Sequence, residues 1–183
     1  MSDRLVHVLC DPDDAPEVSR LLKKSYGAPR LDGRVWFEVD QESCARAQDE
    51  AVILRRVRAC TLRDSTVTIA VIGRCTHSLR SIDWVIKASL FHERGQAPNG
   101  LLVVHLPDST GSEDLSPRLQ ANVRRGAEGY APWYKWPQGG ALWERLIEEA
   151  FVARAGRLSA IQNDEPLMRT NASCRACGVV HDR

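Results

Sequence analysis

The chain has 183 residues and a mass of 20.4 kDa, which suits one ordinary domain or one domain with a short tail. Lys and Arg (25) nearly balance Asp and Glu (24), so no overall field would attract nucleic acid or an anionic membrane. No apolar run in the sequence approaches the ~20 residues of a membrane span, and we expect no signal peptide. Six cysteines are too few for a disulfide scaffold, so we expect reduced thiols and a cytoplasmic protein.

The first third of the chain alternates predicted strands and helices. Residues 5–10 (LVHVLC) form an apolar run that predicts a strand, and the acidic run at residues 11–14 ends it. Apolar residues at helical spacing then predict a helix that ends at Gly27. A second strand is predicted over residues 35–39, and a long helix with a basic face over residues 41–63.

The middle of the chain repeats this alternation. Residues 66–72 (TVTIAVI) are β-branched and nearly all apolar, which is typical of a buried parallel strand. A helix is predicted over residues 81–93 with Ser81 as its N-cap. Residues 101–106 (LLVVHL) predict another buried strand, and residues 108–130 show no clear period and predict a long loop.

The C-terminal third predicts one more strand and one more helix. Prolines limit residues 131–137 to a short edge strand, and residues 141–156 carry the apolar stripe of a helix. Residues 158–183 lack a period and are expected to form a loosely attached tail beside a domain over residues 1–157. The alternation predicts an α/β fold: a mainly parallel five-stranded sheet with helices on both faces, in the flavodoxin-like order 2-1-3-4-5.

Ligands of open α/β sheets bind beyond the carboxyl ends of the strands. In this chain that edge comprises residues 10–14, 73–81, 106–108 and 136–140. The acidic first stretch disfavours a flavin phosphate, which needs a cradle of backbone amides. Gly73 stands where a phospho-acceptor receiver would have its aspartate, and no Walker loop or dinucleotide fingerprint is present in the sequence.

The helix predicted over residues 81–93 has an unusual stripe of small and polar side chains between two apolar stripes. The stripe consists of Ser81, Val85, Ser89 and His92. Asp83 and Lys87 lie on the opposite side of the helix. Two interpretations stay open: the stripe faces a ligand pocket, or its small side chains permit close packing.

Three consecutive segments carry a more specific pattern: a strand ending in Val-Ile-Gly, a helix with tryptophan and isoleucine, and a Gly-Leu-Leu strand. They are residues 65–74 (STVTIAVIGR), 81–90 (SIDWVIKASL) and 99–107 (NGLLVVHLP). In these segments the chain resembles the TIR-like family of the bacterial Thoeris anti-phage systems. The resemblance implies a flavodoxin-like TIR fold, which agrees with the fold expected from the alternation of strands and helices.

The same resemblance implies cleavage of NAD at the bond between nicotinamide and ribose. It implies that the product is a cyclic or conjugated ADP-ribose signal, which activates a separate effector protein. It also implies a catalytic glutamate on the helix, but Val85 stands at that position and can neither carry charge nor accept a hydrogen bond. Asp11 or Asp13 on the first loop would have to compensate, because Asp83 points about 160° away from Val85 around the helix.

Further side chains at this edge are expected to contact NAD, taken as substrate or ligand rather than as a bound cofactor. They are Cys10, Gly73, His77, Ser81, Trp84 and Ser89. Plainer roles remain open for three of them: His77 as a surface residue, Trp84 as a core residue and Cys10 as a structural thiol.

Two functions therefore remain. The first is an NAD-cleaving signalling enzyme with a relocated acid. The second is a catalytically impaired TIR-like binding or regulatory subunit, which acts through a partner or a nucleotide. For both, the resemblance implies assembly with copies of the chain or with other TIR-like subunits.

Five of the six cysteines fall into two groups. Three lie in or beside apolar segments and are expected to be buried: Cys10, Cys60 and Cys75. In the tail, Cys174, Cys177 and His181 supply three of the four ligands of a tetrahedral zinc site. We expect no metal site, since a fourth ligand would have to come from elsewhere in the chain or from another subunit.

Overall fold

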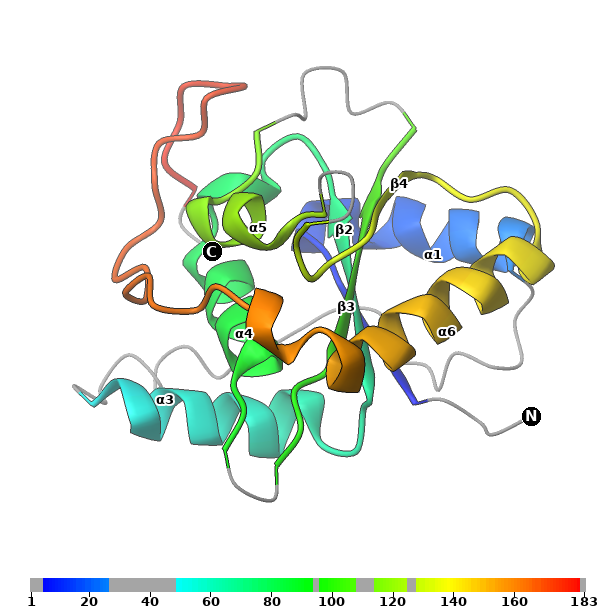
Figure 1. Cartoon of the computed structure of the whole chain (residues 1–183). Helices are drawn as coiled ribbons and strands as arrows, with labels where there is room; N and C mark the ends of the chain where they lie inside the picture. The colour runs from blue at the N-terminus through cyan, green and yellow to red at the C-terminus, as the bar shows by residue number, and fades with distance from the viewer. Residues whose placement is uncertain (1–4, 27–48, 94–95, 108–113, 125–127, 182–183) are drawn as a thin grey trace.

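A computed structural model describes residues 5–26, 49–93, 96–107, 114–124 and 128–181. Its centre is a parallel sheet in the order β1-β2-β3-β4 (Figure 1). The strands are β1 (Val6–Leu9), β2 (Val67–Ile72), β3 (Gly100–His105) and β4 (Trp133–Lys135). These four strands correspond to the first, third, fourth and fifth predicted strands, and they are neighbours in the predicted order. The structure describes four strands and not five, because the strand predicted over residues 35–39 lies outside the described residues.

Helices cover both faces of the sheet, as Figure 1 shows. One face packs against α1 (Ala15–Ser25) and α6 (Gly140–Gly156). The other packs against α3 (Glu50–Val57), α4 (Arg80–Leu90) and α5 (Pro117–Asn122). A π-helical turn, Arg58–Leu62, continues α3. Short 3-10 turns lie at Pro12–Asp14, Thr76–Ser78 and Leu158–Ala160.

Strands β2 and β3 are buried along their whole length, which explains their continuous apolar sequences. Alternate side chains of β2 point to opposite faces of the sheet. Ile69 packs in the core beneath α1 and α6, whereas Ile72 packs in the core beneath α3 and α4. Two separate apolar cores therefore hold the sheet between its helical layers.

Two local predictions are wrong. The predicted loop over residues 108–130 contains α5, which begins with Ser116 as N-cap and Pro117 in its first turn. Ser81 does not cap α4, because the helix already begins at Arg80. The backbone N–H of Arg80 instead donates to Oδ1 of Asn171, at 2.8 Å, so a residue of the C-terminal segment supplies the cap.

The C-terminal segment packs along α4 (Figure 1), which differs from the expectation of a loosely attached tail. Trp84 Nε1 donates to the carbonyl of Met168 at 2.8 Å, and Lys87 Nζ donates to the carbonyl of Glu165 at 2.6 Å. Leu167, 4% exposed, joins the apolar core beneath α4. The segment lacks a period because it interacts largely through backbone carbonyls, which any sequence provides.

A buried ion pair joins α4 to α5 beneath this segment. Arg118 Nε donates to Asp83 Oδ1 at 2.8 Å, and both side chains are less than 5% exposed. Nη2 of the guanidinium donates to the carbonyls of Glu165 and Pro166, and Nη1 donates to Asn163 Oδ1. The backbone N–H of Met168 donates to Asp83 Oδ2. Both charges are thus fully hydrogen-bonded, as buried charges must be.

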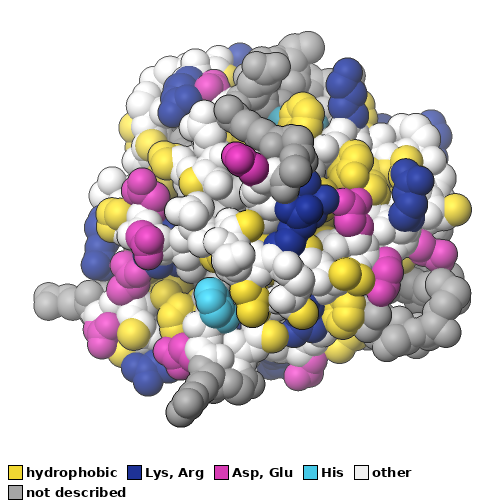
Figure 2. Space-filling view, in the orientation of Figure 1, with side chains coloured by type: hydrophobic (Ala, Val, Ile, Leu, Met, Phe, Trp, Pro, Cys, Tyr) yellow, Lys and Arg dark blue, Asp and Glu magenta, His cyan; other side chains and the backbone are white. Residues whose placement is uncertain are grey.

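Charges of both signs are mixed on the face shown in Figure 2, in line with the near-neutral composition. No helix among the described residues combines the length and the apolar character that crossing a bilayer requires.

Replacing Arg118 by methionine tests the importance of the buried pair. The substitution leaves Asp83 as an unpaired buried charge, so we expect the free energy of unfolding to fall by about 3–5 kcal/mol. Urea denaturation measures the change. Arg20→Met is the matched control, because its partner Glu17 is a surface residue, and it should leave stability nearly unchanged. Equal free energies of unfolding for the two variants would contradict the importance of the buried pair for stability.

Candidate functional site

The carboxyl ends of β1 and β2 form the edge at which the sequence places the site. Cys10 and Asp11 follow β1, and both are 2% exposed. Asp11 shapes the 3-10 turn that comes next: its Oδ1 accepts from the N–H of Asp13 at 3.1 Å, and its carbonyl accepts from the N–H of Asp14 at 2.9 Å. This capped turn carries the chain from β1 into α1 and fixes which aspartate faces the sheet.

Asp14 is the aspartate that turns toward β2. A Cβ placed on Gly73 would lie only 1.8 Å from Asp14 Oδ2, so a side chain at Gly73 would displace the carboxyl. The N–H of Gly73 donates to Thr76 Oγ1 at 2.8 Å, which ties the strand end to the following turn. Asp14 Oδ2 is buried and has no hydrogen-bond partner within the described part of the chain. The carboxyl is therefore held in place with an acceptor still to be satisfied.

The surroundings of Asp14 change its acidity. Burial, together with the nearby charge of Asp11, raises the pKa of the Asp14 carboxyl to about 6. Burial and the same two carboxylates raise the pKa of the Cys10 thiol to about 12. Cys10 is therefore an inert buried thiol at neutral pH, and its predicted burial is confirmed. Asp14 changes its charge close to neutral pH, as a group that binds or transfers a proton would.

Asp13 lies on the same turn but is exposed, so only its backbone takes part in the arrangement just described. The sequence proposed Asp11 and Asp13 and missed Asp14. The sequence does contain a pattern that points to Asp14. An aspartate cap followed by proline forms a turn, and this turn directs the third residue after the cap back toward the sheet.

Neither catalytic candidate on α4 offers a free carboxylate to this edge. Val85 is fully buried in the core beneath α4, where a glutamate would place a charge in an apolar interior. Asp83 is bound to Arg118 beneath the C-terminal segment, so it cannot serve as a catalytic carboxylate at the strand ends. Lys87, which the sequence predicts on the same side of the helix as Asp83, is also buried. Its Nζ lies 2.5 Å from Glu50 Oε1 of α3.

Three other expected contacts lie on α4 as well. Ser81 is half-buried in the first turn, near the carboxyl edge. Trp84 is 2% exposed, and its indole N–H is taken up by Met168. Ser89 is fully buried, and its hydroxyl lies 2.9 Å from the hydroxyl of Thr68, near the amino end of β2. Ser89 is thus distant from the strand ends at which Asp14 lies.

His77 was expected either to contact a ligand or to lie on the surface. It is 7% exposed, and its Nε2 accepts from the backbone N–H of Arg175 at 3.1 Å. Burial lowers the pKa of His77, which keeps the ring neutral at physiological pH. The prediction of buried thiols is wrong for Cys60, which is exposed, and for Cys75, which is partly exposed beside the C-terminal segment.

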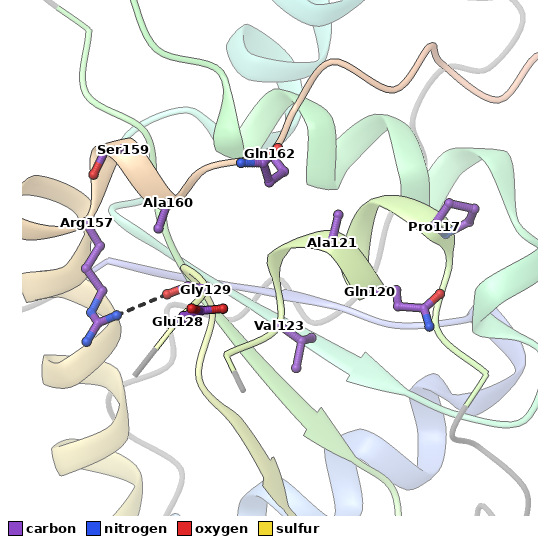
Figure 3. A pocket seen from close by; sticks show the side chains of 10 residues that line it. All are labelled: Pro117, Gln120, Ala121, Val123, Glu128, Gly129, Arg157, Ser159, Ala160 and Gln162. Atoms are coloured by element: carbon purple, nitrogen blue, oxygen red, sulfur yellow. Dashed lines mark hydrogen bonds between the residues drawn. The ribbon is translucent and has the colours of Figure 1, made fainter. Parts of the chain in front are cut away.

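A hollow of about 740 Å³ lies elsewhere, between α5, residues 128–129 and the end of α6 (Figure 3). Gln120, Glu128 and Arg157 are among its lining side chains, and Arg157 Nη1 donates to the carbonyl of Gly129 at 3.2 Å. None of its lining residues belongs to the ends of β1 or β2. The hollow is therefore separate from the edge at Asp14 and Gly73.

The comparison with protein families agrees with this arrangement. Residues 14–111, just over half of the chain, match the family described as Thoeris protein ThsB, TIR-like domain. The chain belongs to this family. The match begins at Asp14 and includes β2, Gly73, α4 and β3. The α/β architecture with its parallel sheet is the TIR-like, flavodoxin-like fold, and membership of the family gives the chain a role in antiphage defence signalling. No curated protein matches the sequence.

The raised pKa of Asp14 predicts a pH-dependent stability. An aspartate whose pKa is about 6 in the fold and 3.8 in the unfolded chain destabilises the fold as pH rises between these values. Asp14→Asn removes this titration. The free energy of unfolding of the variant, relative to that of the native chain, should therefore rise by on the order of 1–2 kcal/mol between about pH 4 and about pH 7, after allowance for partial exposure.

Urea denaturation at the two pH values measures this gain, with Asp13→Asn as the control from the same turn. The control variant should follow the native chain at both pH values. A parallel pH dependence for Asp14→Asn and the native chain would contradict the raised pKa.

Proposed function

We propose that this TIR-like domain binds NAD at the carboxyl edge of its sheet and cleaves the bond between nicotinamide and ribose, with Asp14 as the acting carboxylate. The observation that carries the proposal is the buried, unpartnered Oδ2 of Asp14 held against Gly73. Its position at a strand end, where open α/β sheets bind their ligands, supports the same site. Family membership supports the signalling role.

The chemistry follows from the charge that develops as the bond breaks. The electron pair of the bond leaves with nicotinamide, which becomes neutral, while positive charge grows on the ribose. An ionised Asp14 beside the ribose stabilises that charge and accepts a hydrogen bond from a ribose hydroxyl. Attack on the ribose by water or by a hydroxyl or amine nucleophile completes the reaction and releases one proton. The product is an ADP-ribose derivative, which serves as a signal for a separate effector.

A second candidate is a nucleotide-binding subunit without catalysis of its own. One specific observation favours it: Asp83 is the only acidic residue within α4, and it is bound to Arg118. Helix α4 therefore offers no carboxylate to the strand ends. In an assembly with other TIR-like subunits, such a subunit would bind NAD or an ADP-ribose derivative at Asp14 and leave cleavage to its partner.

Nicotinamide release from NAD by the purified chain tests the first proposal. We expect release by the native chain and a fall of about 100-fold or more for Asp14→Asn, since the variant loses a charge that acts in the transition state. Asp13→Asn is the matched control and should retain activity. Chromatography with mass spectrometry identifies nicotinamide and the ADP-ribose products.

Binding of ADP-ribose by calorimetry separates the two candidates. Binding that Asp14→Asn abolishes, in a chain that releases no nicotinamide, would support the binding subunit. Full cleavage by Asp14→Asn would contradict the role of Asp14, and a chain that neither binds nor cleaves would contradict both candidates. Val85→Glu is unsuitable as a test because Val85 lies fully inside the apolar core.

A further inference from the structure

Four potential metal ligands meet where the C-terminal segment touches the turn after β2. Cys75, Cys174, Cys177 and His181 each offer one ligand atom, and these atoms all lie within 4.8 Å of one another. The sequence supplied three of them and led us to expect no metal, but the fold brings in Cys75 as the fourth. We propose that these four side chains bind a single structural zinc ion.

The C-terminal segment forms a tight hairpin that presents three of the ligands together. The N–H of Gly178 donates to the carbonyl of Cys174 at 2.7 Å, and the N–H of Cys174 donates to the carbonyl of Val179 at 2.9 Å. Gly178 has a φ of +73°, a left-handed conformation that favours glycine. The chain therefore reverses directly after Cys177, and His181 returns to the same side as the two thiols.

Cys75 comes from the opposite side, on the turn between β2 and α4. Hydrogen bonds around it, which do not involve the four ligand atoms, fix the hairpin. Arg74 Nη2 donates to the carbonyl of Ala176 at 3.0 Å, and the N–H of Ala172 donates to the carbonyl of Ser78 at 2.8 Å. The position of Cys75 therefore follows from several contacts along the hairpin, which are independent of the cluster itself.

The distances suit one tetrahedral ion. Zn–S bonds of about 2.3 Å and Zn–N bonds of about 2.0 Å place tetrahedral ligands roughly 3.5–3.8 Å apart. The sulfur atoms of Cys75 and Cys177 are 3.9 Å apart, and Cys177 Sγ lies 3.3 Å from His181 Nε2. A disulfide would need its sulfur atoms at about 2.05 Å, so the cysteines are placed for shared coordination rather than for a covalent bond.

The ligand set also selects the metal and its role. Three thiolates and one imidazole are a common structural zinc set, whereas Ca²⁺ and Mg²⁺ prefer oxygen ligands. Four protein ligands leave no open position for water, so the ion would stabilise the fold without taking part in a reaction. Three thiolates leave one negative charge on a Zn²⁺ complex, and the guanidinium group of Arg74, which donates to the carbonyl of Ala176 within the hairpin, offsets it.

Zinc would link two segments about a hundred residues apart in the sequence. Closing so long a loop restricts the unfolded chain and stabilises the fold. One of the two segments begins directly after Gly73, which contacts Asp14. The ion would therefore also hold the turn that borders the candidate site, although the zinc proposal does not depend on the proposed function.

Elemental analysis of the full chain, purified under reducing conditions without chelators, tests the proposal. We expect one zinc per chain in the native protein and a loss of about tenfold or more in Cys177→Ser and His181→Ala. Cys60→Ser is the matched control, because Cys60 is an exposed free thiol outside the cluster, and it should retain full zinc.

Cobalt substitution of the native chain gives a readout that does not need the variants to fold. Co²⁺ bound by thiolates in a tetrahedral site shows sulfur-to-metal charge-transfer and strong visible bands, which added zinc should remove. Four results would overturn the proposal: less than ~0.1 zinc per folded chain after zinc reconstitution; full zinc in Cys177→Ser; iron in place of zinc; or a disulfide within the cluster.

Discussion

The ion pair between Asp83 and Arg118 is the interaction on which the C-terminal half of the structure depends. Two charges buried at 4% and 1% exposure need more hydrogen bonds than each can give the other. The backbone of residues 163–168 supplies the rest, through the carbonyls of Glu165 and Pro166 and the N–H of Met168. The pair thereby determines the path of the segment along α4, and it lies beside the segment that continues into the hairpin at Cys174.

At the carboxyl ends of β1 and β2 the same principle operates with the opposite result. Asp14 is half-buried near Asp11, its buried Oδ2 has no partner among the described residues, and the pKa of the carboxyl is raised to about 6. A protein rarely leaves a buried acceptor unsatisfied without a function for it. The contrast between Asp83, which is saturated with donors, and Asp14, which lacks one, is the physical reason to place the site at the strand ends and not on the helix.

The sequence predicted the parts of this fold that have a period or a continuous apolar run. Residues 66–72 and 101–106 correspond to β2 and β3 because buried parallel strands need apolar side chains on both faces. Helix α5 and the covered face of α4 escaped prediction, since Asp83 and Lys87 look like solvated residues until the aperiodic tail is placed over them. Whether such residues are buried depends on contacts with distant parts of the chain, which a local sequence pattern does not reveal.

The loop that carries the candidate site could be selected from the sequence, but Asp14 within it could not. The rule for open α/β sheets selected the stretch at residues 10–14, whereas the 3-10 turn decided that Asp14 and not Asp13 faces Gly73. Cys75 could not be assigned to the tail ligands from spacing, because 99 positions separate it from Cys174 and only the path of the tail closes that distance.

The covering of α4 has a consequence for the order in which the chain folds. Arg118 lies 35 positions beyond Asp83 and is synthesised before β4, but Met168 lies 85 positions beyond Asp83 and is synthesised after all the described strands. Until Met168 emerges from the ribosome, Asp83 lacks one of its hydrogen bonds and the indole N–H of Trp84 has no acceptor at Met168. The sheet is therefore complete during synthesis well before its central helix is, and a chain stalled at the end of α6 would expose that helix to other proteins.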